Sequence, residues 1–192
     1  MIMQQRMKQV RLPDDLSARI ETLKQTLFGV LTEFNESIEV IRSNNPVTCP
    51  TYVIIDAIHR PDITVLFEGF ELDWRCLWKG DSADKYALQA PYIAELKEEN
   101  EFTDWLLTQG FGKGWGIFLR SYFSIDELTH HLRKFNQVYS EVDKTWFMFR
   151  YYSPAAITQV LPYLPGQDFV EFMRPINQLM SEVTEKSLVI VR

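Results

Sequence analysis

The chain has 192 residues, 46% of them apolar and 14% aromatic, a composition that excludes a disordered protein and is enough for a sizeable core. Its net charge of −6, without a basic patch or stripe, argues against a protein that binds nucleic acid. No apolar run approaches the ~18 residues of a membrane-spanning helix, so we expect no membrane insertion. The N-terminus lacks the apolar core of a signal peptide and the two cysteines form no CxxC pair, so we expect a cytoplasmic protein.

Residues 14–42 are predicted to form one long amphipathic helix. Apolar residues recur there in steps of three and four, and Pro13 and Asp14 stand where a start signal belongs. The stripe consists of Leu16, Ile20, Leu23, Leu27, Val30, Phe34 and Ile41. Such a helix would be about 45 Å long, which exceeds one side of a small domain. The stripe either packs on the rest of the chain or overhangs and meets a partner or a second copy.

Beyond this helix, short apolar runs alternate with short amphipathic segments. The predicted strands cover residues 52–56, 74–78, 115–120, 146–149 and 188–191, with an extended segment at 91–96. The predicted helices cover residues 63–68, 102–109, 125–135, 154–161 and 169–173. The strand at 146–149 is apolar on both faces, so we expect it near the centre of a sheet. The alternation indicates an α/β protein with a mixed sheet of about five strands covered by helices.

Three helix starts carry explicit capping signals. Asn100 precedes the helix at 102–109, and Ser153 with Pro154 gives an N-cap followed by a proline at the first helical position. Ser124 and Glu127 have the spacing of a capping box, in which the serine hydroxyl and the glutamate carboxylate each bond to the other residue's backbone N–H.

Glycines recur at every second position from Gly110 to Gly116, around Lys113. A phosphate-binding loop needs a strand before it and a helix after it, so that the helix N-terminus faces the phosphate. Here a helix precedes and a strand follows, and the Lys-Ser/Thr pair is missing. We therefore favour a helix C-cap, a tight turn and a close approach of backbones.

Other reactive arrangements have little support in the sequence. His130 and His131 point about 100° apart on their helix and cannot both bind one metal ion from one face. Cys49 with His59 is a conceivable catalytic pair without supporting motif, and Cys76 is expected to pack in a core. Asp56, at the end of a strand, is expected to accept backbone N–H groups at the turn. We therefore expect no catalytic residue, metal ion or cofactor.

Arg75, Arg120 and Arg150 each lie in or at the end of a strand that is rich in aromatic residues. Buried arginines are rare without partners. One interpretation is that Asp56 or another acid pairs with them inside the domain. The other is a recognition edge in which arginine and aromatic side chains gather, as they do in interface hot spots.

Nine short blocks resemble the type VI secretion effector chaperone, or adaptor, family (domain of unknown function 4123). In order, they are YVIIDA, LFEG, RCLW-G, APYIAEL, F-DWL, GKGWGIFLRS, L-HHLRKF, FRYYSP and LP-L, and they span Tyr52 to Leu164. The family pattern usually has aspartate where Ser153 stands, and serine caps a helix equally well.

The resemblance implies a bacterial, cytoplasmic and non-catalytic protein that binds a toxic effector and helps to load it onto the valine–glycine-repeat spike protein. It divides the chain into an N-terminal helical extension (1–50), an adaptor core (51–165) and a short C-terminal extension (166–192). The alternatives are a small-molecule-binding protein or enzyme that uses the glycine loop, Asp56 and Arg120, and an immunity protein that neutralises a toxin.

We expect the partner-binding residues to come from the helix stripe, which also offers a route to self-association, and from the arginine and aromatic blocks. The candidates are Leu23, Leu27, Phe34, Arg75, Arg120, Arg150 and Tyr152.

Overall fold

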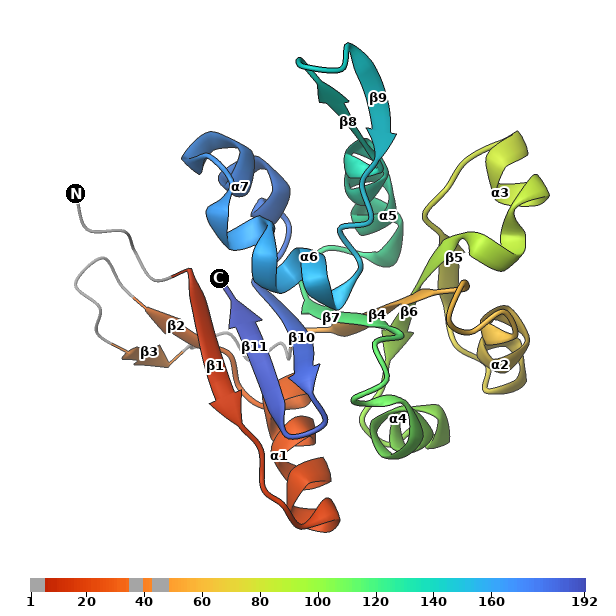
Figure 1. Cartoon of the computed structure of the whole chain (residues 1–192). Coiled ribbons are helices and arrows are strands. Elements are labelled where there is room, and N and C mark those ends of the chain that lie inside the picture. Colours follow the sequence, from red (N-terminus) through yellow and green to blue (C-terminus); the bar gives the residue numbers. More distant parts are fainter. Residues whose placement is uncertain (1–5, 35–39, 43–48) are drawn as a thin grey trace.

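The computed structural model describes residues 6–34, 40–42 and 49–192, with the backbone alone at 32–34 and 40–42 (Figure 1). Its main sheet has seven strands, and each neighbouring pair is antiparallel. In spatial order the strands are β1 (Met7–Arg11), β11 (Ser187–Val191), β10 (Gln178–Thr184), β7 (Gly116–Arg120), β4 (Thr51–Asp56), β6 (Pro91–Leu96) and β5 (Trp74–Cys76). The α/β class is confirmed, but the prediction of a mixed sheet of about five strands is wrong.

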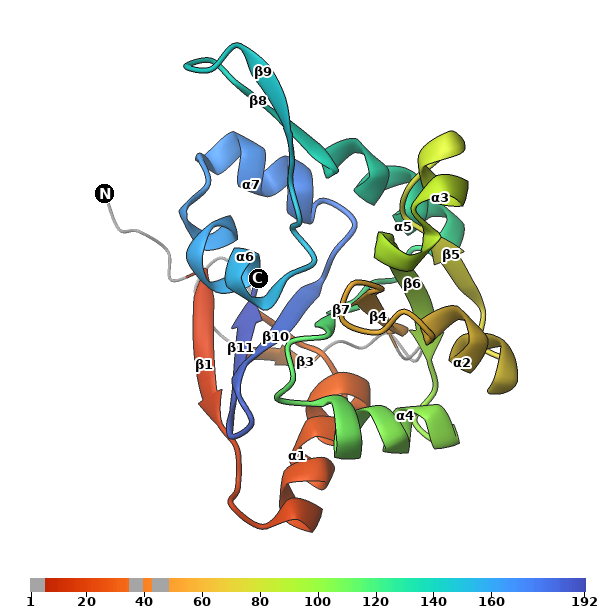
Figure 2. The same ribbon diagram turned by 45° about the vertical axis from the view of Figure 1, so that its right-hand side comes forward.

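Helices cover both faces of this antiparallel sheet, as the two views in Figures 1 and 2 show. One face packs against α5 (Ile125–Leu132), α6 (Pro154–Gln159) and α7 (Gly166–Met173). The other packs against α1 (Leu16–Phe28), α2 (Ile63–Gly69) and α4 (Glu101–Trp105). The short helix α3 (Asp81–Lys85) follows β5.

Strand β4 shows why the direction of the strands was hard to predict. Tyr52 and Ile54 enter one core and Val53 and Ile55 enter the other, so all six positions of the strand are buried. An apolar run that is buried on both faces is typical of parallel sheets. Here helices on both faces produce the same pattern in an antiparallel sheet.

The capping signals in the sequence are confirmed. The side chain of Asn100 accepts a hydrogen bond from the backbone N–H of Phe102 at 2.8 Å. Both halves of the capping box are present, since Ser124 accepts from the backbone of Glu127 and the Glu127 carboxylate accepts from the backbone of Ser124. Ser153 caps α6 with Pro154 in its first turn. These local signals therefore fix where three helices begin.

The long helix predicted for residues 14–42 is wrong. Helix α1 ends at Phe28 with Gly29 as its C-cap, and the chain continues into a small hairpin of β2 (Thr32–Phe34) and β3 (Val40–Arg42). Glycine is a poor helix former, and several residues beyond it are β-branched, which favours extended backbone. The apolar residues keep the heptad spacing beyond residue 29, but the described residues 30–34 and 40–42 form no helix. The side chains of Phe34 and Ile41 lie outside the described residues.

The sequence patterns did not predict two strands of the main sheet, β1 and β10. In β10 the polar residues Gln178, Ser181 and Glu182 interrupt the apolar run that marks a strand, yet all three are buried. The predicted strand at 188–191 is confirmed as β11, which pairs with both β1 and β10. Among the described residues, each helix is too short or too polar to span a bilayer.

Helix α1 packs its apolar stripe on the body of the protein. Leu23 and Leu27 are each 1% exposed and share the core cluster of Val53 and Phe118, whereas Leu16 at the start of the same helix is 47% exposed. This part of the stripe therefore stabilises the fold.

We predict that Leu23→Ala lowers the free energy of unfolding by about 2–5 kcal/mol, because it opens a cavity in a packed core. The matched control Leu16→Ala changes the same helix and should stay within about 0.5 kcal/mol of the parent, since its side chain is largely exposed. Urea unfolding followed by circular dichroism measures both. Equal losses in the two variants would contradict the packing of α1 described above.

Candidate partner-binding surface

Among the described residues, exposed apolar side chains gather on a hairpin outside the main sheet. It consists of β8 (Gln137–Ser140) and β9 (Thr145–Met148), which pair only with each other. Figures 1 and 2 both show it projecting from the body beyond α5. The sequence predicted a strand over residues 146–149 near the centre of a sheet; the strand is confirmed as β9, but its central position is wrong. Apolar residues on both faces of a strand also fit a projecting ribbon.

Both faces of the β8–β9 hairpin carry apolar side chains. Val138 lies opposite Phe147 on one face, and Tyr139 lies opposite Trp146 on the other, with their ring centroids 5.3 Å apart. Trp146 is 64% exposed and Phe147 is 47% exposed. A two-stranded ribbon cannot bury either face by itself, and exposed apolar surface of this kind marks interaction sites.

The turn of the hairpin is polar and closed by its own contacts. The Ser140 hydroxyl donates to the Asp143 carboxylate at 2.7 Å and accepts from the Asp143 backbone N–H at 3.1 Å. Lys144 forms an ion pair with Glu141 at 3.1 Å. These contacts hold the tip in one shape, so the aromatic residues below it are presented on an ordered ribbon.

The C-terminal base of the hairpin is fixed to the sheet. Arg150 forms an ion pair with Asp56, which ends β4, and Asp56 also accepts the backbone N–H of Ile58 at 3.0 Å. The Asp56 side chain is 2% exposed and that of Arg150 is 40% exposed. Tyr151 and Tyr152 then enter the core. Burial, with the charge of Asp56, raises the pKa of Tyr152 to about 12, so its hydroxyl keeps its proton near neutral pH.

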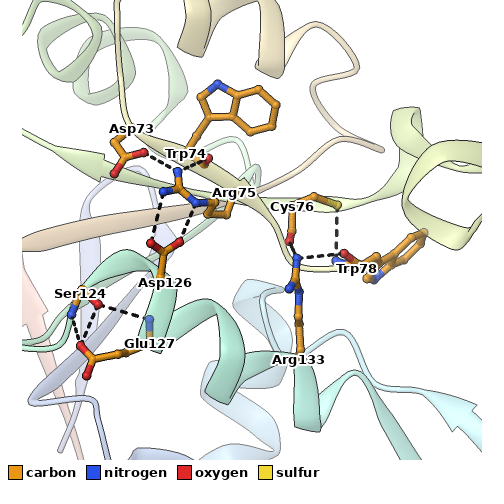
Figure 3. A network of polar contacts seen from close by, with 9 residues as sticks. All are labelled: Asp73, Trp74, Arg75, Cys76, Trp78, Ser124, Asp126, Glu127 and Arg133. Carbon is orange, nitrogen blue, oxygen red and sulfur yellow. Dashed lines mark hydrogen bonds and ion pairs between the residues drawn. The ribbon is translucent and has the colours of Figure 1, made fainter. Parts of the chain in front are cut away.

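The segment that leads into β8 is held by hydrogen bonds to the edge strand β5 and to the two residues that follow it. Figure 3 draws part of this network. Arg133 donates to the carbonyl oxygens of Cys76 at 2.8 Å and Trp78 at 3.3 Å. Asn136, the residue before β8, donates from its side chain to the carbonyl oxygen of Leu77 at 2.8 Å. Both ends of the hairpin are therefore tied to strands of the main sheet.

Arg75 joins the same edge strand to the start of α5. Its guanidinium forms ion pairs with Asp126 and Asp73 (Figure 3), and the hydrogen bonds to these carboxylates raise the pKa of Arg75. Asp126 and Asp73 are both mostly exposed, so this contact is a surface ion pair that positions α5.

The partner-binding residues predicted from sequence do not form one surface. Leu23, Leu27 and Tyr152 are core residues, Arg75 lies in ion pairs at the surface, and Arg150 pairs with the buried Asp56. Arg120 is 1% exposed and donates to the carbonyl oxygens of Cys49 at 3.2 Å and Thr26 at 3.5 Å. The interpretation that acids of the domain pair with these arginines holds for Arg150, which binds Asp56, and for Arg75, which binds Asp73 and Asp126.

The sequence of the hairpin contains a recognisable signal. Four mostly polar turn residues, 141–144, separate two runs that are rich in aromatic and β-branched residues, which is the usual pattern of a β-hairpin.

The glycine loop binds a side chain of the protein itself. The backbone N–H groups of Gly112 and Gly114 donate to the two carboxylate oxygens of Glu182 on β10. The cavity beside the loop measures about 10 Å³, which is room for about one water molecule. This geometry agrees with the argument from sequence against a phosphate loop.

The described part of the chain holds no group of three or more His, Cys, Asp or Glu side chains arranged to bind a metal ion. His131 is buried, and its Nε2 lies 3.0 Å from the carbonyl oxygen of Phe172. Burial raises the pKa of the half-buried Cys76 thiol. His131 and Cys76 therefore act as packing residues.

A family model described as "Domain of unknown function (DUF4123)" matches residues 51–168 of the chain. No curated protein and no solved structure matches. The matched range contains β4, β7 and the β8–β9 hairpin with both of its anchors, whereas β1, β10 and β11 lie outside it.

We predict that Arg150→Met lowers the free energy of unfolding by about 1–3 kcal/mol, because it leaves the buried Asp56 carboxylate without its cation. The matched control Arg75→Met removes an exposed ion pair and should cost less than about 1 kcal/mol. Adding Asp56→Asn to Arg150→Met should recover part of the loss, since a neutral amide needs no cation. Urea unfolding measures all four proteins. A loss at Arg150 no larger than that at Arg75 would show that the buried pair is not an anchor.

Proposed function

The chain belongs to the DUF4123 family, and we propose that it is a non-catalytic adaptor that binds a secreted effector of a bacterial type VI secretion system. In this proposal the protein acts in the bacterial cytoplasm and helps to load the effector onto the spike protein. The proposal rests on the nine ordered sequence blocks together with one structural observation, the exposed apolar hairpin β8–β9 within the matched residues.

The hairpin has the properties that a protein–protein contact needs. Its exposed aromatic side chains are large and have few rotatable bonds, so ordering them on binding costs little entropy. Anchors at both ends hold it in place before the partner arrives. We therefore assign the effector-binding surface to the hairpin, in place of the α1 stripe.

The alternative of a small-molecule-binding protein relied on the glycine loop, Asp56 and Arg120 being available to a ligand. Each of its three features has a partner within the fold: the glycine loop binds Glu182, Asp56 binds Arg150, and Arg120 donates to backbone carbonyls.

The proposal predicts a stable complex when the protein is co-expressed with the toxin encoded beside its gene, and higher solubility of that toxin. Deleting the gene should abolish secretion of the effector. Absence of a complex with any neighbouring effector or spike protein would refute the adaptor function. Protection of toxin-exposed cells, without an effect on secretion, would identify an immunity protein instead.

Within that complex, the double substitution Trp146→Ala and Phe147→Ala should weaken effector binding by at least about 30-fold, as expected for residues at the centre of an interface. The stability of the free protein should change by no more than about 0.5 kcal/mol, because both side chains are exposed. Isothermal titration calorimetry and urea unfolding measure the two quantities.

The matched control is Phe123→Ala, an aromatic residue of similar exposure at the opposite end of α5 from the hairpin. It should leave effector binding unchanged. If the hairpin variant binds as tightly as the parent, the complex forms through another surface and the assignment of the hairpin is wrong.

A further inference from the structure

The loop that precedes β7 is shaped to surround an anion. Gly112 and Gly114 have φ angles of 90° and 71°, in the left-handed region that favours glycine. This backbone turns two N–H groups, two residues apart, toward one carboxylate, so that Gly112 donates to one oxygen of Glu182 and Gly114 to the other. Backbone N–H groups that converge in this way form an anion-binding nest.

The carboxylate reaches the nest from a distant part of the chain. Glu182 lies on β10, which shifts its register against β11 between Glu182 and Thr184. An irregularity of this kind re-aims a side chain. Glu182 lies outside the family-matched residues, whereas both glycines lie inside them. The contact therefore docks the C-terminal strands onto the matched domain.

The surroundings of this contact exclude most water. Glu182 is 7% exposed, and the cavity beside it is lined by apolar residues that include Val53, Ile55 and Phe118. No ion pair of Glu182 with a basic side chain occurs among the described residues. Burial raises the pKa of Glu182, and the two backbone hydrogen bonds oppose that rise. Hydrogen bonds to a carboxylate gain strength where water is excluded.

We propose that the loop from Gly110 to Gly116 is a carboxylate-binding site that Glu182 occupies as a built-in ligand, and that it takes up a free small carboxylate when Glu182 is shortened. Glu182→Ala removes the Cγ atom and the carboxylate group, which together match the size and shape of acetate. Formate also fits, whereas propionate is one carbon too long. Phosphate is larger than the carboxylate that the loop holds.

The test compares the melting temperature of Glu182→Ala in acetate and in chloride at equal ionic strength and pH. The substitution should lower the melting temperature in chloride by about 3–8 °C. Acetate should restore at least half of that loss, formate somewhat less, and propionate and phosphate little. The parent protein in the same salts reports the general effect of each salt. If acetate raises the variant no more than the parent, the site does not bind carboxylates.

A residue-level readout follows the loop itself. The amide resonances of Gly112 and Gly114 should move on Glu182→Ala and return toward their original positions as acetate is added. Gly114→Ala, which strains the loop but leaves Glu182 in place, is the control and should show no recovery in acetate. Resonances that ignore acetate would overturn the proposal.

A variant without the charge and a refolding assay complete the test. Glu182→Gln keeps the shape of the side chain without its charge, so it should be intermediate in stability and insensitive to acetate, and parent-like stability would show that the charge is not recognised. If Glu182→Ala does not fold in chloride, the refolded yield in acetate replaces the melting temperature. A higher yield in acetate supports the site, and equal yields refute it.

Discussion

Strand β7 holds the molecule together, because it pairs with β4 along one edge and with β10 along the other. β4 and β7 belong to the family-matched residues, whereas β10 lies in the C-terminal segment. At Gly116 the backbones of β7 and β4 approach so closely that a Cβ atom on this residue would lie 1.8 Å from the carbonyl oxygen of Ile54. A side chain at this position would force β7 away from β4, so the sheet depends on glycine there.

Each of these three strands carries a buried charged residue among the described residues. Asp56 ends β4 and binds Arg150, Arg120 ends β7 and donates to the carbonyl oxygen of Cys49, and Glu182 on β10 binds the glycine loop. A buried charge costs free energy unless it is paired or hydrogen-bonded. Each of these charges has such a contact with a segment outside the sheet. The strands bury apolar side chains, and their three buried charged residues fix the hairpin, the segment before β4 and the glycine loop.

The sequence predicted local features well and distant contacts poorly. Strand β4 and the capping box at Ser124 depend on neighbouring residues, and both are confirmed. The long helix failed because Gly29 ends it, although the apolar spacing continues. For the site, the order of elements around the glycine loop was enough to argue against phosphate. That Glu182 binds there, about 70 positions along the chain, is a tertiary contact that no local pattern contains. Arginine chemistry alone could not separate the buried Arg120 from the half-buried Arg150.

The hairpin β8–β9 shows how an exposed apolar ribbon can resemble a core strand in sequence. Selection for folding alone would favour polar residues on a projecting ribbon, because exposed aromatic side chains promote aggregation. Trp146 and Phe147 are nevertheless exposed, and contacts at Asn136 and Arg150 fix the two ends of the ribbon to the body. The net charge of −6 gives two copies of the chain a mutual repulsion. Under the proposal of an effector adaptor, this ribbon, which is apolar on both faces and fixed at both ends, is the surface that meets the partner.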